Sequence, residues 1–192
     1  MNTKRGRPRN AEAEKAVLAA SYDLLLEIGF GAVTVDKIAE RAQVSKATIY
    51  KWWANKAAVV MDGFMSAAAA RLPVPDTGSV FNDILIHATN LAQFLTSREG
   101  KIITELIGEG QFDQGLAEAY RSRYFNPRRL EARLLLERGV QRKELKETLD
   151  IELTIDLIYG PVFYRLLLTG EQIDDTFIKN LVTIAFEGIQ SS

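Results

Sequence analysis

The sequence contains no cysteine and only one histidine, His87. The lack of cysteine excludes disulfide bonds and thiol chemistry, and it is typical of a cytoplasmic protein. With one histidine, the nucleophile–base pairs of most hydrolases lack their parts, and a metal site would depend on carboxylates. No glycine-rich phosphate loop follows a strand pattern. The sequence therefore predicts no enzyme, no metal site and no cofactor.

Long hydrophobic runs are absent too. The most apolar stretch, residues 157–170, is interrupted by Arg165 and is shorter than the roughly 20 residues that a membrane-spanning helix needs. The amino terminus is basic, but no apolar segment follows it, so we expect no signal peptide. With 47% hydrophobic and 26% charged residues, the chain can bury a core. These features predict a cytoplasmic protein with no membrane partner.

Helical periodicity of apolar residues runs through the chain, and no alternating strand pattern of useful length is present. The predicted fold class is therefore all-α. Gly29 is expected to end the first helix, the sequence GEGQ to break another, and Pro127 to stand in a first helical turn. The segments 113–125 and 127–139 form either a helix pair or one kinked helix. Outside residues 34–53, helices are expected at 11–28, 55–72, 80–96, 98–107, 113–125, 127–139, 150–168 and 174–189.

Residues 34–53 predict two short helices joined by a tight turn at Gln43-Val44. Thr34 and Ser45 each precede a helix and can cap it, because a side-chain oxygen accepts a hydrogen bond from an otherwise unpaired backbone N–H. The second helix buries Ile49 and exposes a polar face suited to phosphates and base edges in a major groove. That polar face carries Lys46, Thr48, Tyr50 and Lys51. This is the helix-turn-helix pattern.

Residues 29–60, GFGAVTVDKIAERAQVSKATIYKWWANKAAVV, resemble the DNA-binding signature of the TetR family of repressors. The matching positions are Gly29-Phe30, Thr34-Val35, Ile38-Ala39, Val44-Ser45, Thr48-Ile49-Tyr50, Trp53 and Asn55-Lys56. One position departs from the family pattern, which usually has glycine in the turn where this chain has Gln43. If Gln43 adopts a left-handed conformation, the side chain costs about 1 kcal/mol.

The resemblance implies a domain order and a set of DNA contacts. We expect a basic arm at residues 1–10, a three-helix helix-turn-helix DNA-binding domain at 11–56 (the head), and a helical effector-binding and dimerisation domain at 57–192 (the body). Lys56 is expected to contact a phosphate, since helix N-termini attract phosphate, although a solvent-exposed lysine is the alternative. The expected DNA-contacting residues are Arg5, Arg7, Arg9, Thr34, Ser45, Lys46, Thr48, Tyr50, Lys51 and Lys56.

Charge is distributed unevenly along the chain. Residues 1–60 hold ten Lys or Arg against six Asp or Glu, a net +4, which leaves −5 for the remainder because the whole chain carries −1. Within the arm, Arg-Gly-Arg-Pro-Arg resembles the core of an AT-hook, a segment that lies in the narrow minor groove of A·T-rich DNA. The alternative is a solvated tail that adds only non-specific attraction to phosphates. The asymmetry indicates a DNA-binding head on a larger acidic body.

The segment 150–168 is apolar on nearly all sides, so it must be covered on several sides. We expect it to pair with segment 174–189 and with the same helices of a second copy in a four-helix bundle, giving a homodimer. A monomeric core helix is the alternative. The expected interface residues are Ile155, Ile158, Val162, Leu166, Phe177, Leu181 and Ile184.

The resemblance also implies a cavity for an unknown small-molecule effector between the middle helices of the body. The aromatic residues named for it could instead be ordinary core. The expected lining residues are Phe94, Phe112, Tyr120, Tyr124 and Phe163, with His87 and Arg121 as polar anchors.

Together these features predict a cytoplasmic homodimeric repressor that binds a palindromic double-stranded DNA operator and is released by an effector. Repression and activation are not distinguished, because that depends on where the operator lies. Two rival functions are an effector-independent architectural binder of A·T-rich DNA and a helical ligand carrier whose head no longer binds DNA.

Overall fold

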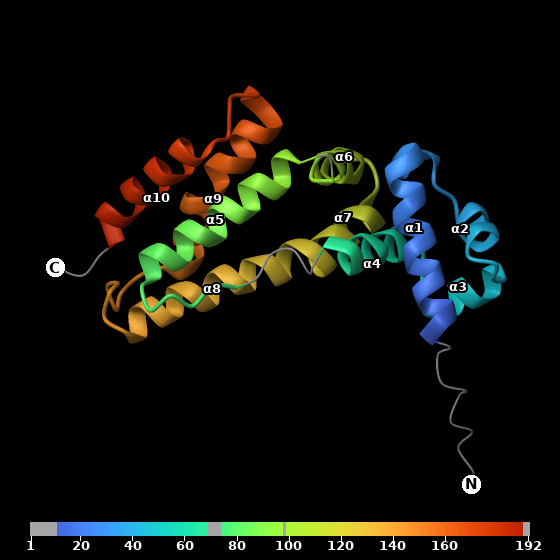
Figure 1. The fold of residues 1–192 in the computed structure, drawn as a ribbon, viewed down its shortest axis with the longest axis horizontal. Helices are drawn as coiled ribbons and strands as arrows, with labels where there is room; N and C mark the ends of the chain where they lie inside the picture. Colours follow the sequence, from blue (N-terminus) through green and yellow to red (C-terminus); the bar gives the residue numbers. More distant parts are fainter. Residues whose placement is uncertain (1–10, 69–73, 98, 190–192) are drawn as a thin grey trace, which may run out of the picture.

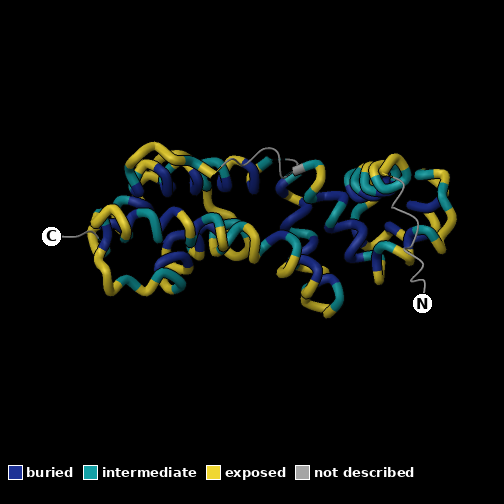
Figure 2. The backbone as a smooth tube through the Cα atoms, turned by 90° about the horizontal axis from the view of Figure 1, so that it is seen from below, coloured by how far each residue is buried: buried dark blue, intermediate teal, exposed yellow. Residues whose placement is uncertain are grey.

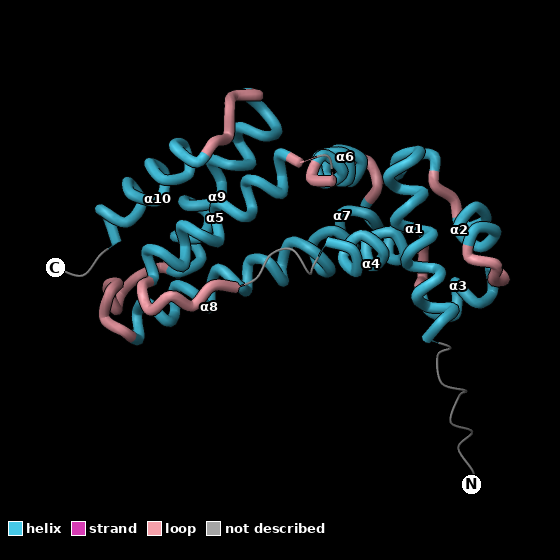
Figure 3. Tube along the Cα trace, viewed as in Figure 1, coloured by secondary structure: helices cyan, strands magenta, loops and turns pink. Residues whose placement is uncertain are grey.

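In the computed structural model, residues 11–68, 74–97 and 99–189 are described. These residues form helices, turns and loops, with no β-strand among them (Figure 3). The predicted all-α class is confirmed. The basic arm, residues 1–10, and the predicted end of the fourth helix near residue 72 lie outside the described residues.

The amino-terminal helices gather at one end of the molecule (Figure 1). They are α1 (Ala11–Ala32), α2 (Val35–Arg41), α3 (Lys46–Trp52) and α4 (Lys56–Ala68). Helix α4 lies close against α1 because Gly63 has no side chain. A Cβ atom at Gly63 would stand 2.1 Å from Ser21 Oγ and 2.7 Å from the Leu18 carbonyl oxygen. Helix α4 also contacts the helix at Val80–Thr96, where the Phe64 ring packs against Phe94 with ring centroids 6.1 Å apart.

Gly29 interrupts α1 as the sequence predicts, but the chain then makes one more turn to Ala32. Its backbone angles, φ 71° and ψ 162°, are non-helical. The site is also crowded, since a Cβ atom at Gly29 would stand 2.6 Å from Glu105 Oε1. Glycine therefore serves both the positive φ and the close approach of α6.

The body is a second group of helices, which extends from α4 to the far end of the molecule (Figure 1). It contains α5 (Val80–Thr96), α6 (Lys101–Gly110), α7 (Gln114–Tyr120), a π-helical segment η2 (Arg121–Phe125), α8 (Asn126–Gln141), α9 (Ile151–Tyr164), a second π-helical segment η3 (Arg165–Thr169) and α10 (Asp175–Ile189).

Two boundaries differ from the sequence prediction. Helix α6 begins at Lys101 and continues through Gly108 to Gly110, so the GEGQ stretch ends the helix and does not break it earlier. Helices α7 and α8 are joined by η2 without a break, which favours the kinked-helix alternative. Pro127 gives the reason, because a proline inside a helix clashes with the carbonyl four residues earlier, here that of Arg123, and the turn widens into a π-helix.

Buried and exposed residues alternate along the helices, so the helices have a covered side and an open side (Figure 2). On α9, Ile155, Ile158 and Val162 are buried in the chain's own core, whereas Leu157 is 59% exposed. In η3, which follows α9, Leu168 is 75% exposed. The amphipathic helix α10 covers one side of α9 and leaves the other uncovered.

A buried aspartate fixes the start of the body. The Asp83 carboxylate accepts hydrogen bonds from the Thr77 backbone N–H at 2.6 Å and the Thr77 hydroxyl at 2.8 Å. The Arg142 guanidinium donates to its second oxygen at 3.3 Å. Burial alone would raise the pKa of Asp83, but these three contacts outweigh it and hold the pKa below its ordinary value.

Candidate nucleic-acid interface and ligand cavity

Local hydrogen bonds set the geometry of the helix-turn-helix. The Thr34 hydroxyl accepts from Lys37 N at 3.2 Å, and the Ser45 hydroxyl accepts from Thr48 N at 3.2 Å, so both predicted N-caps are present. Between the helices, Gln43 has a φ of 54°, the left-handed conformation in which other sequences favour glycine. The turn therefore holds α3 at a fixed angle to α2 despite the missing glycine.

Helix α3 presents its predicted polar face to solvent. Tyr50 is 55% exposed and Lys51 is exposed, while Ile49 is buried beneath them. The Thr48 hydroxyl lies 2.9 Å from the Ser45 hydroxyl, so the N-cap residue also orients this side chain. A tyrosine ring, two hydroxyls and an ammonium on one short helix are suited to base edges and phosphates in a major groove.

Lys46, on the same helix, is held by an acidic neighbour. Its ammonium lies 2.6 Å from the Asp36 carboxylate, and the hydrogen bond to Asp36 raises the pKa of Lys46. Both side chains are more than half exposed. An exposed ion pair of this kind is weak and is screened by salt, so a DNA phosphate can replace Asp36 at small cost.

The described part of the head is electrically neutral. Residues 11–60 hold six Lys or Arg and six Asp or Glu. The net +4 of the first 60 residues is therefore carried entirely by Lys4, Arg5, Arg7 and Arg9, which lie outside the described residues. If the chain binds DNA, its long-range attraction to phosphates is expected to come from these four residues, and α3 is expected to supply short-range contacts.

Lys56, predicted to meet a phosphate, has partners within the chain. Its Nζ donates to the Phe30 carbonyl oxygen at 3.0 Å and lies 4.0 Å from the centre of the Phe30 ring. Phe30 N, in turn, donates to Glu105 Oε1 at 2.7 Å. Lys56 thus ties α4 to the bend that follows Gly29, and Glu105 ties the same bend to α6. An ammonium has three N–H donors, so a phosphate contact from Lys56 stays compatible with this arrangement.

A second polar link joins the end of α3 to the body. Trp53 Nε1 donates to one oxygen of Asp62 at 2.7 Å, and Arg123 donates to the other oxygen at 2.8 Å. Trp53 directly follows α3, Asp62 lies on α4, and Arg123 lies on η2. One carboxylate therefore connects the end of α3 to the π-helical segment.

Next to η2 lies a cavity of about 250 Å³. It is bordered by α5, η2, α8 and α9 and is partly open to solvent, and most of its lining atoms belong to aliphatic or aromatic side chains. The lining residues are His87, Leu91, Tyr124, Phe125, Arg128, Arg129, Ala132, Ile155, Asp156, Tyr159, Gly160 and Phe163. A largely apolar cavity with a few polar groups is the usual form of a small-molecule site.

The residues predicted to line an effector cavity fall into three groups. His87, Tyr124 and Phe163 line the cavity described above. Tyr120 and Arg121 line a second hollow of about 250 Å³ between α6, α7 and η3, and Phe163 belongs to both. Phe94 is core, and Phe112 is 95% exposed in the turn after α6, so the structure brings neither to a cavity.

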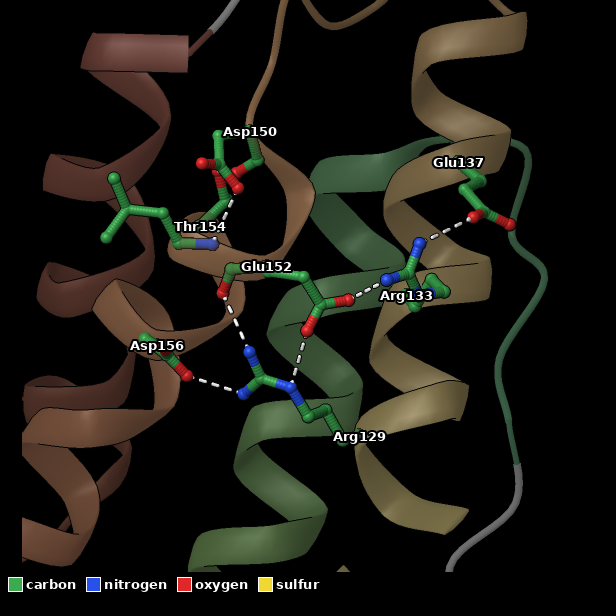
Figure 4. A network of polar contacts seen from close by, with 8 residues as sticks. Arg129, Arg133, Glu137, Asp150, Glu152, Thr154 and Asp156 are labelled. Atoms are coloured by element: carbon green, nitrogen blue, oxygen red, sulfur yellow. Dashed lines mark hydrogen bonds and ion pairs between the residues drawn. The ribbon is translucent and has the colours of Figure 1, made fainter. Parts of the chain in front are cut away.

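The polar wall of the cavity includes residues that the sequence prediction missed. The Arg129 guanidinium lies 2.6 Å from Glu152 and 2.5 Å from Asp156, across from α8 to α9 (Figure 4). Arg133 extends the same network to Glu152 and Glu137. These residues stand on separate helices, and no spacing along the chain indicates that they meet.

The predicted dimer residues are also divided. Ile155, Ile158 and Val162 are buried in the chain's own core, and their predicted part in a dimer contact stays a prediction. Leu166, Phe177 and Leu181 are half-buried, and Ile184 is 68% exposed. Because α9 carries apolar residues on nearly all sides, the sequence pattern could not tell its inner face from its outer face. The exposed apolar residues of α9, η3 and α10 are Leu153, Leu157, Tyr164, Leu167, Leu168 and Ile184.

In the described part of the chain, no group of three or more histidine, aspartate or glutamate side chains could hold a metal ion. Over the same residues, no helix combines the length and the hydropathy needed to cross a lipid bilayer.

Comparison with protein families gives two matches that together span most of the chain. Residues 17–61 match the model for bacterial regulatory proteins of the tetR family. Residues 74–185 match the model for the tetracyclin repressor-like C-terminal domain. The first match covers the helix-turn-helix, and the second covers the helices that enclose the cavity.

Individual proteins are similar over nearly their full length. The uncharacterized HTH-type transcriptional regulator YdeS of Bacillus subtilis (strain 168) is 66% identical over 192 residues, which is 100% of this chain and 97% of that protein. The DNA-binding transcriptional repressor TetR of Mycobacteroides abscessus is 30% identical, over 93% of this chain and 92% of its own. The crystal structure of the regulator SCO0332 superposes with a TM-score of 0.81 at 36% identity, over 94% of this chain and 100% of its own.

Proposed function

The chain belongs to the TetR family of DNA-binding transcriptional regulators, which is not a family of enzymes, and from this premise we propose that it is a homodimeric repressor. The proposed dimer binds a palindromic operator in double-stranded DNA, and a small molecule in the cavity releases it. Because it acts on chromosomal DNA, we expect it in the cytoplasm. The observation that carries the proposal is the pairing of an exposed polar α3 with an uncovered apolar face on α9 and α10.

In the proposed complex, α3 enters the major groove. Tyr50 and Lys51 project from the helix, Lys46 exchanges Asp36 for the DNA, and Thr48 and Ser45 contribute hydroxyls. Thr34 and Lys56 contact the backbone beside the groove. The arm, with Arg5, Arg7 and Arg9, lies in the adjacent minor groove, where arginines are attracted by the enhanced negative potential.

The dimer is proposed from the apolar face of α9, η3 and α10. Leu153, Leu157 and Tyr164 are exposed and recur at spacings of four and seven residues, so they share one face of α9. An exposed apolar face of this kind usually marks an interface. Two-fold packing of these helices would form the four-helix bundle expected from the sequence. A dimer also meets the needs of recognition, because two heads about 34–36 Å apart can read successive major grooves.

Release by a ligand requires a connection between the cavity and α3. Tyr124 lines the cavity and directly follows Arg123, which holds Asp62 and through it Trp53. We propose that a ligand against Tyr124 shifts η2 and so changes the angle of α3. The hydrogen bond from Phe30 N to Glu105 is a second polar contact between the body, through α6, and the head. The coupling must be reciprocal, with a typical size of about 1–3 kcal/mol.

The proposal is tested by DNase footprinting on the gene's own upstream region together with analytical ultracentrifugation. Wild-type protein is expected to sediment as a dimer at micromolar concentration and to protect a palindromic segment. Leu157→Glu places a charge in the apolar face and should give monomers that protect nothing. Leu130→Glu is the matched control, because Leu130 is a similarly exposed leucine on α8. A monomeric wild type that still gives the footprint would refute the dimer.

The rival architectural function is distinguished by affinity on different DNA. A palindromic operator should bind at least about 10³-fold more tightly than a random duplex of the same length. A ratio near one on every fragment, with preference only for A·T-rich DNA, would favour the architectural binder.

A further inference from the structure

The chemistry of the cavity walls indicates which class of molecule the cavity accepts. Its volume of about 250 Å³ lies just below the range of about 300–1,000 Å³ that is usual for drug-sized ligands. Its lining includes aromatic rings from two elements, Tyr124 and Phe125 from η2 and Phe163 from α9. The space therefore suits a small molecule with a flat apolar body.

The charged groups beside the cavity already have partners of opposite sign. Arg129 is held by Glu152 and Asp156, as Figure 4 shows, and Arg128 lies 2.8 Å from Glu131. The Arg128 Nε atom is buried without a hydrogen-bond partner, but Glu131 already neutralises the charge of its guanidinium. An ionised ligand would therefore have to compete with one of these pairs or be buried without a counter-charge. Both are costly in a site of low polarity, so an uncharged ligand is favoured.

The histidine on the wall is satisfied as well. His87 Nδ1 lies 2.7 Å from the Tyr159 hydroxyl, and His87 Nε2 lies 3.5 Å from Glu131. Burial raises the pKa of Tyr159, so its hydroxyl keeps its proton, and the hydroxyl and His87 Nδ1 share one hydrogen bond. The other ring nitrogen, Nε2, faces the carboxylate of Glu131. Neither group is open to a ligand without breaking this arrangement.

Tyr124 is different. Its side chain is 2% exposed and lines the cavity, yet its hydroxyl has no hydrogen-bond partner in the described structure. Burial raises the pKa of Tyr124, so the hydroxyl stays protonated. A buried hydroxyl without a partner costs about 1–3 kcal/mol, so a molecule that supplies one is bound more tightly. The aromatic ring withdraws electron density from the phenolic oxygen, which makes the group a better donor than acceptor.

We propose that the cavity binds a small, uncharged aromatic molecule whose carbonyl or ether oxygen accepts a hydrogen bond from the Tyr124 hydroxyl. The inference rests on the proposed function in one respect, that this cavity is the effector site. It adds the ligand class: one acceptor oxygen, no charge, and a flat body that packs against Phe125 and Phe163.

Titration calorimetry with three probes of similar size tests the class. Acetophenone is uncharged and has one acceptor oxygen, ethylbenzene lacks the oxygen, and benzoate carries a charge. We expect acetophenone to bind most tightly. Tyr124→Phe should weaken the binding of acetophenone by about two- to tenfold and leave the affinity for ethylbenzene unchanged, because only the ketone accepts a hydrogen bond from the hydroxyl. Tighter binding of benzoate would overturn the uncharged class, and an equal effect of the substitution on both neutral probes would overturn the hydrogen bond.

Melting temperature without ligand gives an independent measurement. Tyr124→Phe removes a buried hydroxyl that has no partner and should raise the melting temperature by about 2–4 °C. Tyr159→Phe is the matched control, since it removes a hydroxyl that serves His87 and should lower the melting temperature. A lower melting temperature for Tyr124→Phe would show that the hydroxyl is satisfied in the free protein, and the proposal would fall.

The DNA footprint is measured separately with acetophenone present. If acetophenone binds through Tyr124 but leaves the footprint intact, the ligand class stands and the release step of the proposed function fails. If none of the probes binds, the ligand class fails, while the footprint and the dimer still test the rest of the proposed function.

Discussion

The head and the body are both helical, but they are held together by different kinds of contact. In the head, each cap joins residues three positions apart, as Ser45 does with Thr48. In the body, the decisive polar contacts join distant segments, as His87 does with Tyr159 and Asp83 with Arg142. Contacts between neighbouring residues leave the polar side chains of the head at the surface, where they are accessible to DNA. Contacts between distant segments bury the polar side chains of the body, where they are accessible to a small molecule in the cavity.

This difference also separates the two kinds of recognition. The head is neutral over residues 11–60 and presents exposed donors on α3, with Lys46 paired to Asp36 until DNA replaces that carboxylate in the proposed complex. Among the described residues of the body, the charges beside the cavity are paired, and the buried hydroxyl of Tyr124 has no hydrogen-bond partner. In the proposed function, the head therefore reads DNA with little rearrangement, and the state of the body depends on what fills the cavity.

The largest expected effect comes from removing the exposed ring at the centre of α3. Tyr50→Ala should lower operator affinity by about 10³-fold, towards non-specific binding, because it removes a base contact without touching the core. Circular dichroism should be unchanged, since Tyr50 is exposed. Phe112→Ala removes a still more exposed ring from the body and should leave the footprint unchanged. Loss of helicity in Tyr50→Ala would mean that the head is not independent of this side chain.

Deleting residues 1–9 tests whether attraction to DNA is divided between arm and α3. The deletion removes four positive charges and leaves a neutral head, so affinity should fall about 10- to 100-fold at moderate salt. The slope of log affinity against log salt should become shallower by about 2–4, for two to four lost phosphate contacts. A slope equal to that of the full chain would assign the salt dependence to α3 and discard a role for the arm.

Gly63 lies where head and body are joined, and a side chain there should disturb both. Gly63→Ala would push the new methyl group into Ser21 and the Leu18 carbonyl, at a cost of about 1–3 kcal/mol in the free energy of unfolding. Gly108→Ala, in the open part of α6, is the control and should be neutral or slightly stabilising. Chemical denaturation measures both variants, and equal stability of the two would argue against close contact of α1 with α4.

The smallest expected effect depends on pH and belongs to the body. Because the folded pKa of Asp83 is lowered, its stabilisation is present above the ordinary value near 4 and is lost as the pH falls through the folded pKa. Asp83→Asn should cost about 1 kcal/mol at pH 7 and flatten the stability profile below pH 4. Asp76→Asn changes an exposed carboxylate 3.7 Å from Arg142, and it should alter neither the stability at pH 7 nor the stability profile below pH 4. An unchanged acid profile in Asp83→Asn would exclude this aspartate as a source of acid sensitivity.

Much of the head could be predicted from the sequence because its contacts are local. The caps Thr34 and Ser45, the left-handed position at Gln43 and the interruption at Gly29 are found where the sequence indicates them. The helices of the body were also predicted, but which side of each helix is buried and which is exposed was not. Ile155 and Ile158 were expected on the surface of a dimer and are buried, and Phe112 was expected in a cavity and is exposed.

The sequence by itself determined the class, the order of the helices and the DNA-reading motif, since each depends on residues within a few positions of one another. Only the tertiary structure decided which side of α9 faces inward, that Asp62 joins Trp53 to Arg123, and that Tyr124 is left without a partner beside a cavity. The physical reason is that periodicity specifies a helix and its apolar residues, whereas the choice between two apolar faces depends on which distant helices cover them.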